Sequence, residues 1–201
     1  MKRVLVTGFE PFLSHKENPT QQIVDQLQDR VIGDYQVHGV ILPVTFSEAA
    51  KIVIDSIDHL KPDAIMMLGL AAGRNRITPE RVAINVNDGE VDNDGVKKQD
   101  EPIIEGGPAA YFSTLPIRKF IDALTKEQIP ASISNTAGTY VCNNIMYQVL
   151  HALNDQNRRT PAGFIHVPAS HQLALETANV PSLSLHEMVQ AVEIMIGELE
   201  G

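Results

Sequence analysis

Residues 134–168 decide the fold, and they read S-N-T-A-G-T-Y-V-C-N-N-I-M-Y-Q-V-L-H-A-L-N-D-Q-N-R-R-T-P-A-G-F-I-H-V-P. The first part passes from small, turn-forming residues into a pattern with apolar side chains at every fourth position, which predicts a helix over 139–153. The second part is an apolar run that stops at Pro168 and predicts a buried strand over 162–167. A helix followed closely by a buried strand is typical of an α/β fold.

The rest of the chain repeats this alternation of short apolar runs and amphipathic patterns. Further strands are predicted at 3–7, 35–42, 64–68, 80–86 and 131–134. Further helices are predicted at 19–28 with Asn18 as N-cap, from a Ser47 cap onward, at 117–126, and from a Ser184–Glu187 capping box to about 199. Residues 87–108, rich in glycine, proline and acids, are predicted to form a long surface loop.

Composition limits the class of protein. A chain of 201 residues that is 43% hydrophobic and 20% charged fits a single domain over 1–201. The formal net charge of −9 argues against a nucleic-acid partner. No apolar run approaches the length of a membrane span, and no signal-peptide pattern follows Lys2 and Arg3, so we expect a cytoplasmic protein without a membrane partner. The histidines are not spaced like metal ligands, and the common phosphate-binding and dinucleotide-binding motifs are missing from the sequence. We therefore expect neither a metal nor a cofactor.

Cys142 is the single cysteine, and it lies in the first turn of the predicted helix. Unpaired N–H groups at a helix start stabilise a thiolate, so we expect a lowered pKa and a nucleophilic role. The alternative is a buried, inert thiol. A single cysteine forms no internal disulfide, which agrees with a reducing compartment, although a bridge between chains stays open.

His166 ends a predicted strand, at the edge where catalytic groups of open α/β sheets collect. Its alternative role is that of a hydrogen-bonded core histidine.

Three long segments then match a known family in the right order. They are G-L-A-A-G-R-N-R-I-T-P-E-R-V-A-I-N at 69–85, I-P-A-S-I-S-N-T-A-G-T-Y-V-C-N at 129–143 and G-F-I-H-V-P at 163–168. Together with L-V-T-G-F-E-P-F at 5–12, the chain resembles the type I pyroglutamyl peptidases, or pyrrolidone carboxyl peptidases, over nearly its whole length. The resemblance implies a three-layer α/β/α sandwich with a mixed, largely parallel sheet, related to phosphorylase and hydrolase folds. It also implies a homo-oligomer, tetramer or dimer.

The resemblance implies a cysteine exopeptidase that removes an N-terminal pyroglutamyl residue from peptides through a thiol acyl-enzyme. Cys142 would attack, His166 would shuttle the proton, and Glu80 would hold the imidazole in one tautomer. The alternative for Glu80 is a structural ion pair with Arg81 or Arg74.

The resemblance also implies a pocket for the lactam ring of the substrate. Apolar walls are expected from Phe9 and Phe12, a hydrogen bond from Asn18 and another to the backbone carbonyl of Leu70, with Thr45, Val141 and Ile145 nearby. Alternatively, the two phenylalanines pack beneath their own loop.

One segment departs from the family. Many members read D-A-R-I-P-D after the I-N strand, whereas residues 88–93 read D-G-E-V-D-N and put Glu90 at the place of the arginine. A carboxylate near the thiol would oppose its ionisation, unless Gly89 lets Glu90 turn into solvent. Two other classes of function therefore stay open: an amidase or deamidase with the same three residues, or a ligand-binding relative that has lost turnover.

Overall fold

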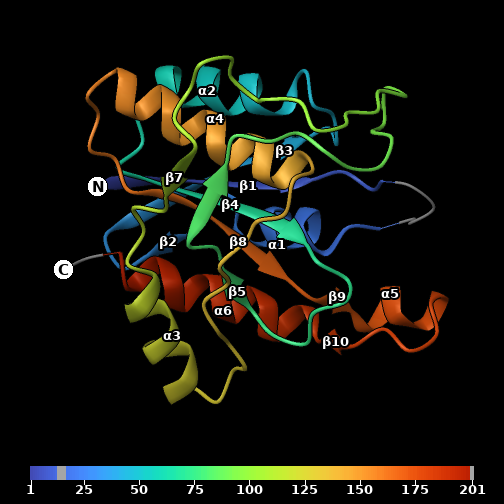
Figure 1. The fold of residues 1–201 in the computed structure, drawn as a ribbon. Helices are drawn as coiled ribbons and strands as arrows, with labels where there is room; N and C mark the ends of the chain where they lie inside the picture. Colours follow the sequence, from blue (N-terminus) through green and yellow to red (C-terminus); the bar gives the residue numbers. More distant parts are fainter. Residues whose placement is uncertain (13–16, 200–201) are drawn as a thin grey trace.

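The computed structural model describes residues 1–12 and 17–199 and builds them around one six-stranded sheet (Figure 1). In order across the sheet, the strands are β2 (Val31–Ile32), β3 (Tyr35–Leu42), β1 (Lys2–Phe9), β4 (Ala64–Leu70), β8 (Ala162–Val167) and β5 (Thr78–Pro79). The four inner strands are parallel to one another, and the two edge strands run antiparallel to their neighbours. The predicted mixed, largely parallel sheet is confirmed.

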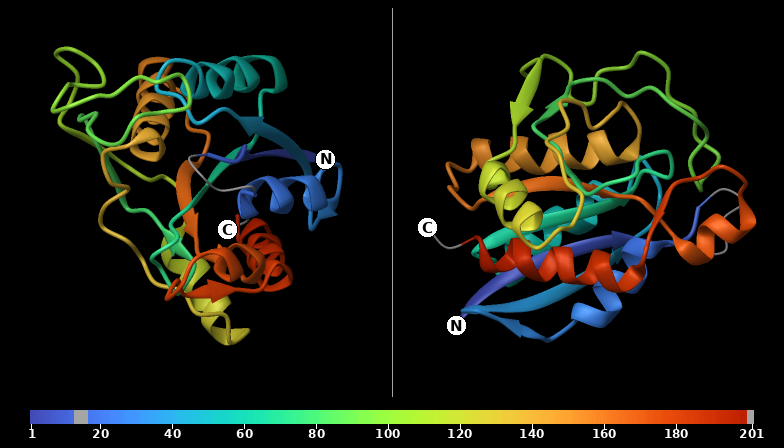
Figure 2. Two further views of the ribbon diagram at one scale, coloured as in Figure 1. Left: turned by 90° about the vertical axis from the view of Figure 1, so that its right-hand side faces the viewer. Right: turned by 90° about the horizontal axis from the view of Figure 1, so that it is seen from below.

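Helices cover both faces of this sheet. One face carries α2 (Ala49–Leu60) and α4 (Val141–Asp155), and the other carries α1 (Pro19–Leu27), α3 (Ile117–Lys126) and α6 (Leu185–Gly197). Figure 1 shows α2 and α4 above the sheet with α3 and α6 below it, and the left view of Figure 2 shows α1 beside α6. The predicted three-layer sandwich is thereby confirmed.

Alternation along the inner strands explains why both faces are covered. On β4, Ile65 and Met67 pack under α2 and α4, whereas Ala64, Met66 and Leu68 join the core beneath α1 and α6. All five side chains have no exposed surface. A strand that is apolar on both sides requires a helical layer on each side, as expected for the centre of a parallel sheet.

Several short elements were not predicted, because segments of two to six residues are too short to show a clear period. They are the edge strands β2 and β5, the strand β7 (Ala110–Phe112), which pairs antiparallel with β6 (Val82–Ile84), the parallel pair β9 (Ala169–Ser170) and β10 (Ser182–Leu183), and α5 (His171–Glu176). None of the helices in the described part of the chain has the length and hydropathy needed to span a membrane.

Two predicted strands are wrong in extent. The strand over 80–86 is reduced to β6, because Glu80 lies before it and is joined to Ser134 by an isolated bridge. The strand over 131–134 is replaced by that bridge and a second one between Ile77 and Ala131. Pro79 accepts from Ser134 N at 3.0 Å but has no N–H to donate back to the opposite segment, so the two bridges do not join into a continuous ladder.

The predicted helix starts are right at two places and wrong at one. The Asn18 side chain accepts a hydrogen bond from Thr20 N at 3.1 Å, and Ser184 and Glu187 form the expected capping box. Ser47, in contrast, does not cap α2, whose N-cap is Glu48 without a side-chain bond to the helix. The turn before α2 is instead held by Phe46 N, which donates to the Asp92 carboxylate at 2.9 Å.

The loop over 87–108 is irregular, as predicted, but part of it is buried. Asp92 is 6% exposed, and its carboxylate accepts hydrogen bonds from the backbone N–H groups of Phe46, Asp94 and Val96. Asn93 N donates to the carbonyl of Val44 at 3.0 Å. These bonds fasten the loop to the segment between β3 and α2.

Close contact between β1 and α1 depends on Gly8. A Cβ atom at this position would lie 2.4 Å from the carbonyl oxygen of Thr20, a backbone atom that cannot move without shifting the helix. We therefore expect Gly8→Ala to lower the free energy of unfolding by about 1–3 kcal/mol, the usual cost of overpacking, as measured by urea denaturation.

Gly197 is the matched control, since a Cβ there meets no atom within 4 Å. Gly197→Ala is expected to change stability by less than about 1 kcal/mol. Equal unfolding midpoints for Gly8→Ala and the parent chain would contradict the described packing of β1 against α1.

Candidate active site

Cys142 lies at the start of α4, beside the carboxyl ends of β4 and β8. The helix has Tyr140 as its N-cap and begins at Val141, so Cys142 is in the first turn as predicted. A Cβ atom added at Gly69 would lie 3.0 Å from Sγ of Cys142, and Gly69 pairs with His166 across β4 and β8. The absence of a side chain at Gly69 therefore leaves room for the thiol over β4, next to the position of His166 on β8.

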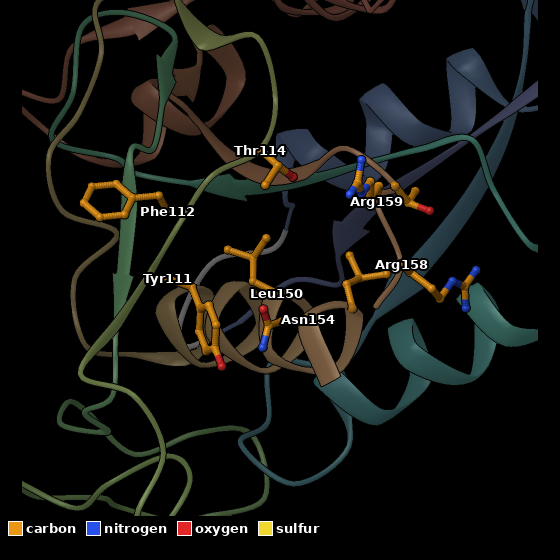
Figure 3. Close-up of a pocket in the computed structure, with 9 residues that line it drawn as sticks. Tyr111, Phe112, Thr114, Leu150, Asn154, Arg158 and Arg159 are labelled. Atoms are coloured by element: carbon orange, nitrogen blue, oxygen red, sulfur yellow. The ribbon is translucent and has the colours of Figure 1, made fainter. Parts of the chain in front are cut away.

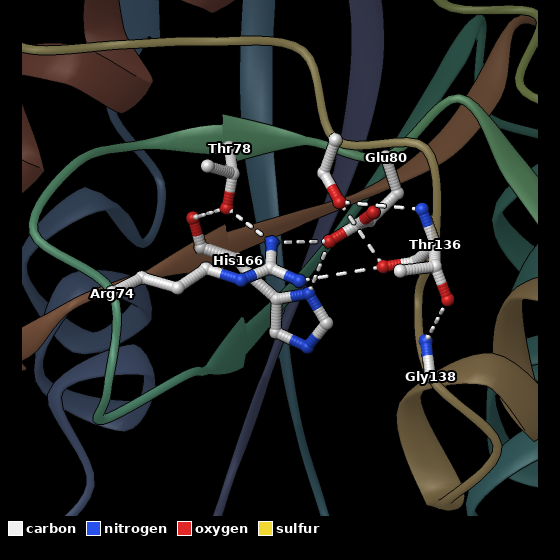
Figure 4. A network of polar contacts seen from close by, with 7 residues as sticks. Arg74, Thr78, Glu80, Thr136, Gly138 and His166 are labelled. Carbon is white, nitrogen blue, oxygen red and sulfur yellow. Dashed lines mark hydrogen bonds and ion pairs between the residues drawn. The ribbon is translucent and has the colours of Figure 1, made fainter.

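His166 is held by Glu80. Nδ1 of the imidazole is 2.6 Å from Oε1 of Glu80, and the side chains of the two residues are 7% and 0% exposed (Figure 4). An ionised carboxylate only accepts hydrogen bonds, so Nδ1 carries the proton and Nε2 is left as an acceptor. Phe164, two residues earlier on β8, places its ring 4.9 Å from the imidazole. The tautomer with the proton on Nδ1 and a free lone pair on Nε2 is the one that a general base needs.

Glu80 also forms an ion pair with Arg74. Nη1 of Arg74 is 2.6 Å from the same Oε1 atom and 2.6 Å from Oγ1 of Thr78, and Nη2 donates to the carbonyl of Thr136 at 3.3 Å (Figure 4). Arg81 instead donates to Asn135 at 2.8 Å. The ion pair considered for Glu80 on sequence grounds is thus present with Arg74, together with the hydrogen bond to His166.

The thiol is not ionised in the way its helix position suggested. Burial, and to a smaller extent the nearby Glu80 carboxylate, raise the pKa of Cys142 to about 12, against the opposing effects of Arg74 and of the backbone N–H of Cys142 itself. The expected lowering is therefore wrong, because desolvation of the charged thiolate outweighs the helix terminus. Burial also lowers the pKa of His166, against the opposing effect of Glu80. Near neutral pH the site holds a thiol and a neutral imidazole.

A narrow cavity of about 50 Å³ opens beside the thiol. Its lining consists of Phe9, Phe12, Asn18, Val44, Leu70, Tyr140, Val141 and Cys142. Among the residues predicted for the pocket, Thr45 and Ile145 do not line it. Thr45 is buried next to Val44, where Oγ1 accepts from Glu48 N at 3.3 Å, and Ile145 is buried in the core one turn below Val141.

Two lining residues, Val44 and Tyr140, were not predicted. The ring of Tyr140 packs edge-on against Phe46 with centroids 5.2 Å apart, and its hydroxyl donates to the carbonyl of Val91 at 3.2 Å. Tyr140 could have been found from its position just before Val141 and Cys142. Val44 gives no comparable signal, because only the folded loop brings it to the cavity.

Asn18 contributes to the cavity wall and to the helix start at once. Its Oδ1 accepts from Thr20 N and from Thr20 Oγ1, and its Nδ2 donates to the carbonyl of Glu10 at 3.1 Å. A side-chain amide has two N–H donors, and among the described residues the carbonyl of Glu10 is the acceptor of one of them, so the second N–H can serve a ligand in the cavity.

Glu90 is exposed, and it lies in the loop that passes Tyr140. Burial, with smaller contributions from the charges of Asp92, Cys142 and Glu90, raises the pKa of the Tyr140 phenol to about 12. Gly89 approaches the same ring, since a Cβ at Gly89 would lie 2.7 Å from Cδ2 of Tyr140. The effect of Glu90 on the reactivity of Cys142 stays a prediction.

A larger cavity, of about 280 Å³, lies at the other end of α4 (Figure 3). It is lined by Tyr111, Phe112, Thr114, Leu150, Leu153, Asn154, Arg158, Arg159 and Thr160. This lining has no thiol, imidazole or carboxylate, so the smaller cavity beside Cys142 is the candidate site. In the described ranges, no three His, Cys, Asp or Glu side chains are close enough together to hold a metal ion.

An α/β sandwich with a thiol, an imidazole and a carboxylate at the carboxyl edge of its sheet defines a cysteine-type hydrolase. Comparison with known proteins makes the class specific. The pyroglutamyl peptidase family model matches residues 2–199, and the chain belongs to this family.

Sequence similarity to relatives extends over nearly the whole chain. The pyrrolidone-carboxylate peptidase of Halalkalibacterium halodurans is 52% identical over 197 residues, which are 98% of each chain. That of Oceanobacillus iheyensis is 50% identical over 200 residues, or 100% of each chain. Among solved structures, a mutant pyrrolidone carboxyl peptidase from P. furiosus superposes with a TM-score of 0.95 at 42% identity, covering 98% of this chain and 97% of the other.

The electrostatics of the thiol lead to a prediction for its alkylation. With a pKa of about 12, the thiolate fraction of Cys142 grows with pH throughout the neutral range. The rate of alkylation by iodoacetamide should therefore rise about tenfold for each pH unit between about pH 6 and pH 9. Mass spectrometry of the intact chain follows the reaction cleanly, since the sequence has one cysteine. A rate that is constant below about pH 8 would contradict this, because it would show a thiolate already formed.

Proposed function

We propose that this chain hydrolyses the bond after an N-terminal pyroglutamyl residue, with Cys142 as nucleophile, His166 as general base and acid, and Glu80 as the group that orients His166. One observation carries the assignment. A thiol at the wall of a small, mostly apolar cavity lies against Gly69, the partner of His166 across the sheet, and Nδ1 of His166 is bound to the buried Glu80 at 2.6 Å.

In the first step, Nε2 of His166 takes the proton from the thiol while Sγ attacks the pyroglutamyl carbonyl carbon. The carbonyl oxygen becomes an oxyanion. The N-cap Tyr140 makes no side-chain hydrogen bond to the first turn of α4, so backbone N–H groups there, including that of Cys142, are placed to stabilise the negative charge. One such donor is worth about 3 kcal/mol in related reactions.

In the second step, the imidazolium returns its proton to the nitrogen of the departing peptide, and the C–N bond breaks to leave a thioester. Neutral His166 then removes a proton from water, which attacks the thioester carbonyl. Breaking of the C–S bond releases free pyroglutamate, and the proton held by His166 restores the thiol. Throughout, the Glu80 carboxylate stabilises the imidazolium that forms twice in each cycle.

Specificity follows from the size and the chemistry of the cavity. The lactam ring is small and uncharged, so it fits apolar walls such as Phe9, Phe12 and Val141 better than a charged side chain would. The spare N–H of Asn18 matches the lactam carbonyl, and the backbone carbonyl of Leu70 matches the lactam N–H. A proline ring lacks that carbonyl and would leave the buried amide of Asn18 without a partner.

Three further expectations stay predictions beside this function. They are a single domain over residues 1–201, a homo-oligomer (tetramer or dimer), and a location in the cytoplasm. Family membership favours the peptidase over the alternative amidase, and the intact Cys142, His166 and Glu80 favour turnover over a purely binding relative.

The first test measures hydrolysis of a pyroglutamyl arylamide. Cys142→Ala and His166→Ala should each lower kcat/KM by roughly ten-thousand-fold, and the double variant should be no worse, because residues of such a set act as a unit. His59→Ala is the control, since His59 is exposed on α2 and its Nδ1 contacts the carbonyl of Asp55. Full activity of Cys142→Ala would overturn the assignment of the nucleophile.

The second test separates the two roles of Asn18. Asn18→Ala should destabilise the chain by about 1–2 kcal/mol through the lost cap of α1, and it should also lower the preference for pyroglutamyl over prolyl arylamide by about tenfold. Ser184→Ala removes an equivalent cap from α6, so it should cost similar stability and leave the preference unchanged. An equal preference in Asn18→Ala and Ser184→Ala would exclude Asn18 from lactam recognition.

A further inference from the structure

The Glu80 carboxylate has few partners for a charge that is completely buried. Oε1 receives hydrogen bonds from His166 Nδ1 and from Arg74 Nη1, both at 2.6 Å. Oε2 is buried and has no hydrogen-bond partner among the described residues. Among the described residues, the Glu80 carboxylate is therefore held in its orientation through Oε1 alone. Besides His166, the residue that binds Oε1 is Arg74.

Arg74 is linked to all three segments that carry the reacting groups, to two of them directly and to the strand of His166 through Thr78. Besides Glu80, its Nη1 binds Oγ1 of Thr78, which in turn donates to the backbone carbonyl of His166 at 3.3 Å. Its Nη2 binds the carbonyl of Thr136, in the loop that leads into the helix of Cys142. Around a single guanidinium, these contacts join the segment of Thr78 and Glu80, the strand of His166 and the loop before Cys142 (Figure 4).

Resting on the function proposed above, we propose that Arg74 is a positioning residue of this enzyme, which fixes the Glu80 carboxylate toward His166 and ties the loop of Cys142 to both. A guanidinium offers several N–H donors in a rigid plane, so it can hold three acceptors at once. Lysine has a single nitrogen on a flexible chain and cannot reproduce this geometry. The charge and the shape of Arg74 should therefore have separable effects.

The charge acts on the reacting groups as well. Arg74 lowers the pKa values of both His166 and Cys142. Loss of the guanidinium thus favours protonation of both groups, and the acid limb of the pH profile of kcat/KM should move to higher pH. A residue with a merely structural role would change stability without moving this limb.

The experiment compares Arg74→Ala, Arg74→Lys and the parent chain with a pyroglutamyl arylamide. Arg74→Ala should lower kcat about a hundredfold with little change in KM, and its acid limb should shift upward. Arg74→Lys should also lose kcat but keep the acid limb near that of the parent. Arg76→Ala is the control, since it removes the same charge from the same turn. Arg76 is exposed and its Nε donates to the side chain of the neighbouring Asn75, so this variant should behave like the parent chain.

Chemical rescue adds a readout that depends on the missing group. Arg74 is 29% exposed in its side chain and lines an open cavity of about 470 Å³ with Gly73, Asn75, Arg76, Thr78, Ser132, Ser134 and Pro181. Millimolar guanidinium chloride should therefore restore part of kcat in Arg74→Ala, relative to an equal concentration of sodium chloride. It should have no such effect on the parent chain.

Alkylation of Cys142 by iodoacetamide needs no turnover, so it tests Arg74 even if the substrate has been assigned wrongly. Arg74→Ala should be alkylated more slowly than the parent at each neutral pH, and Arg74→Lys at nearly the parent rate. Parent-like kcat, acid limb and alkylation in Arg74→Ala would overturn the proposal, as would a change in KM alone. If Arg74→Ala does not fold, Arg74→Lys decides, and an unchanged kcat there would overturn it.

Discussion

The buried hydrogen bond between Glu80 and His166 is the interaction on which the site depends. A carboxylate with no exposed surface is costly unless its charge is compensated, and removing one partner of such a pair typically costs about 3–5 kcal/mol. Here the compensation comes from an imidazole on β8 and a guanidinium from the turn after β4. The buried charge of Glu80 needs hydrogen-bond partners, and these partners come from the segments that carry the proposed catalytic residues. The same contacts therefore stabilise this edge of the sheet and arrange the candidate site.

Burial also sets the resting state of the proposed nucleophile. The pKa of Cys142 is raised to about 12, and that of His166 is lowered by desolvation. The thiol is therefore kept neutral until an acceptor for its proton and a carbonyl for its sulfur are both in place. A neutral thiol is a poor target for oxidants, which react with the thiolate. In the proposed mechanism, the same low-dielectric surroundings strengthen the hydrogen bonds to the oxyanion.

A structural feature could be predicted from the sequence where neighbouring residues determine it, and could not where distant residues do. Helix starts at Asn18 and Ser184 and the apolar run of β8 follow from neighbouring residues, and they were predicted with nearly the right limits. The two bridges that replace the strand over 131–134 depend on pairing with a distant segment. No period within four residues could have indicated how far that pairing extends.

The site shows the same division. Cys142, His166 and Glu80 stand in long motifs, whereas Val44 reaches the cavity through a loop fastened by Asn93 and Asp92, far along the chain. The thiol pKa was predicted with the wrong sign because the helix terminus is a local feature and desolvation is a property of the whole fold.

Direct detection of the acyl-enzyme tests the central claim most sharply. The chain would be mixed with a pyroglutamyl arylamide, quenched in acid within the first turnovers, digested, and mapped by mass spectrometry. A pyroglutamyl group attached to the peptide that contains Cys142, absent when Cys142→Ala is treated in the same way, is the predicted result. Hydrolysis of the arylamide at the same rate by Cys142→Ala, with no acyl group on any peptide of the parent chain, would contradict it.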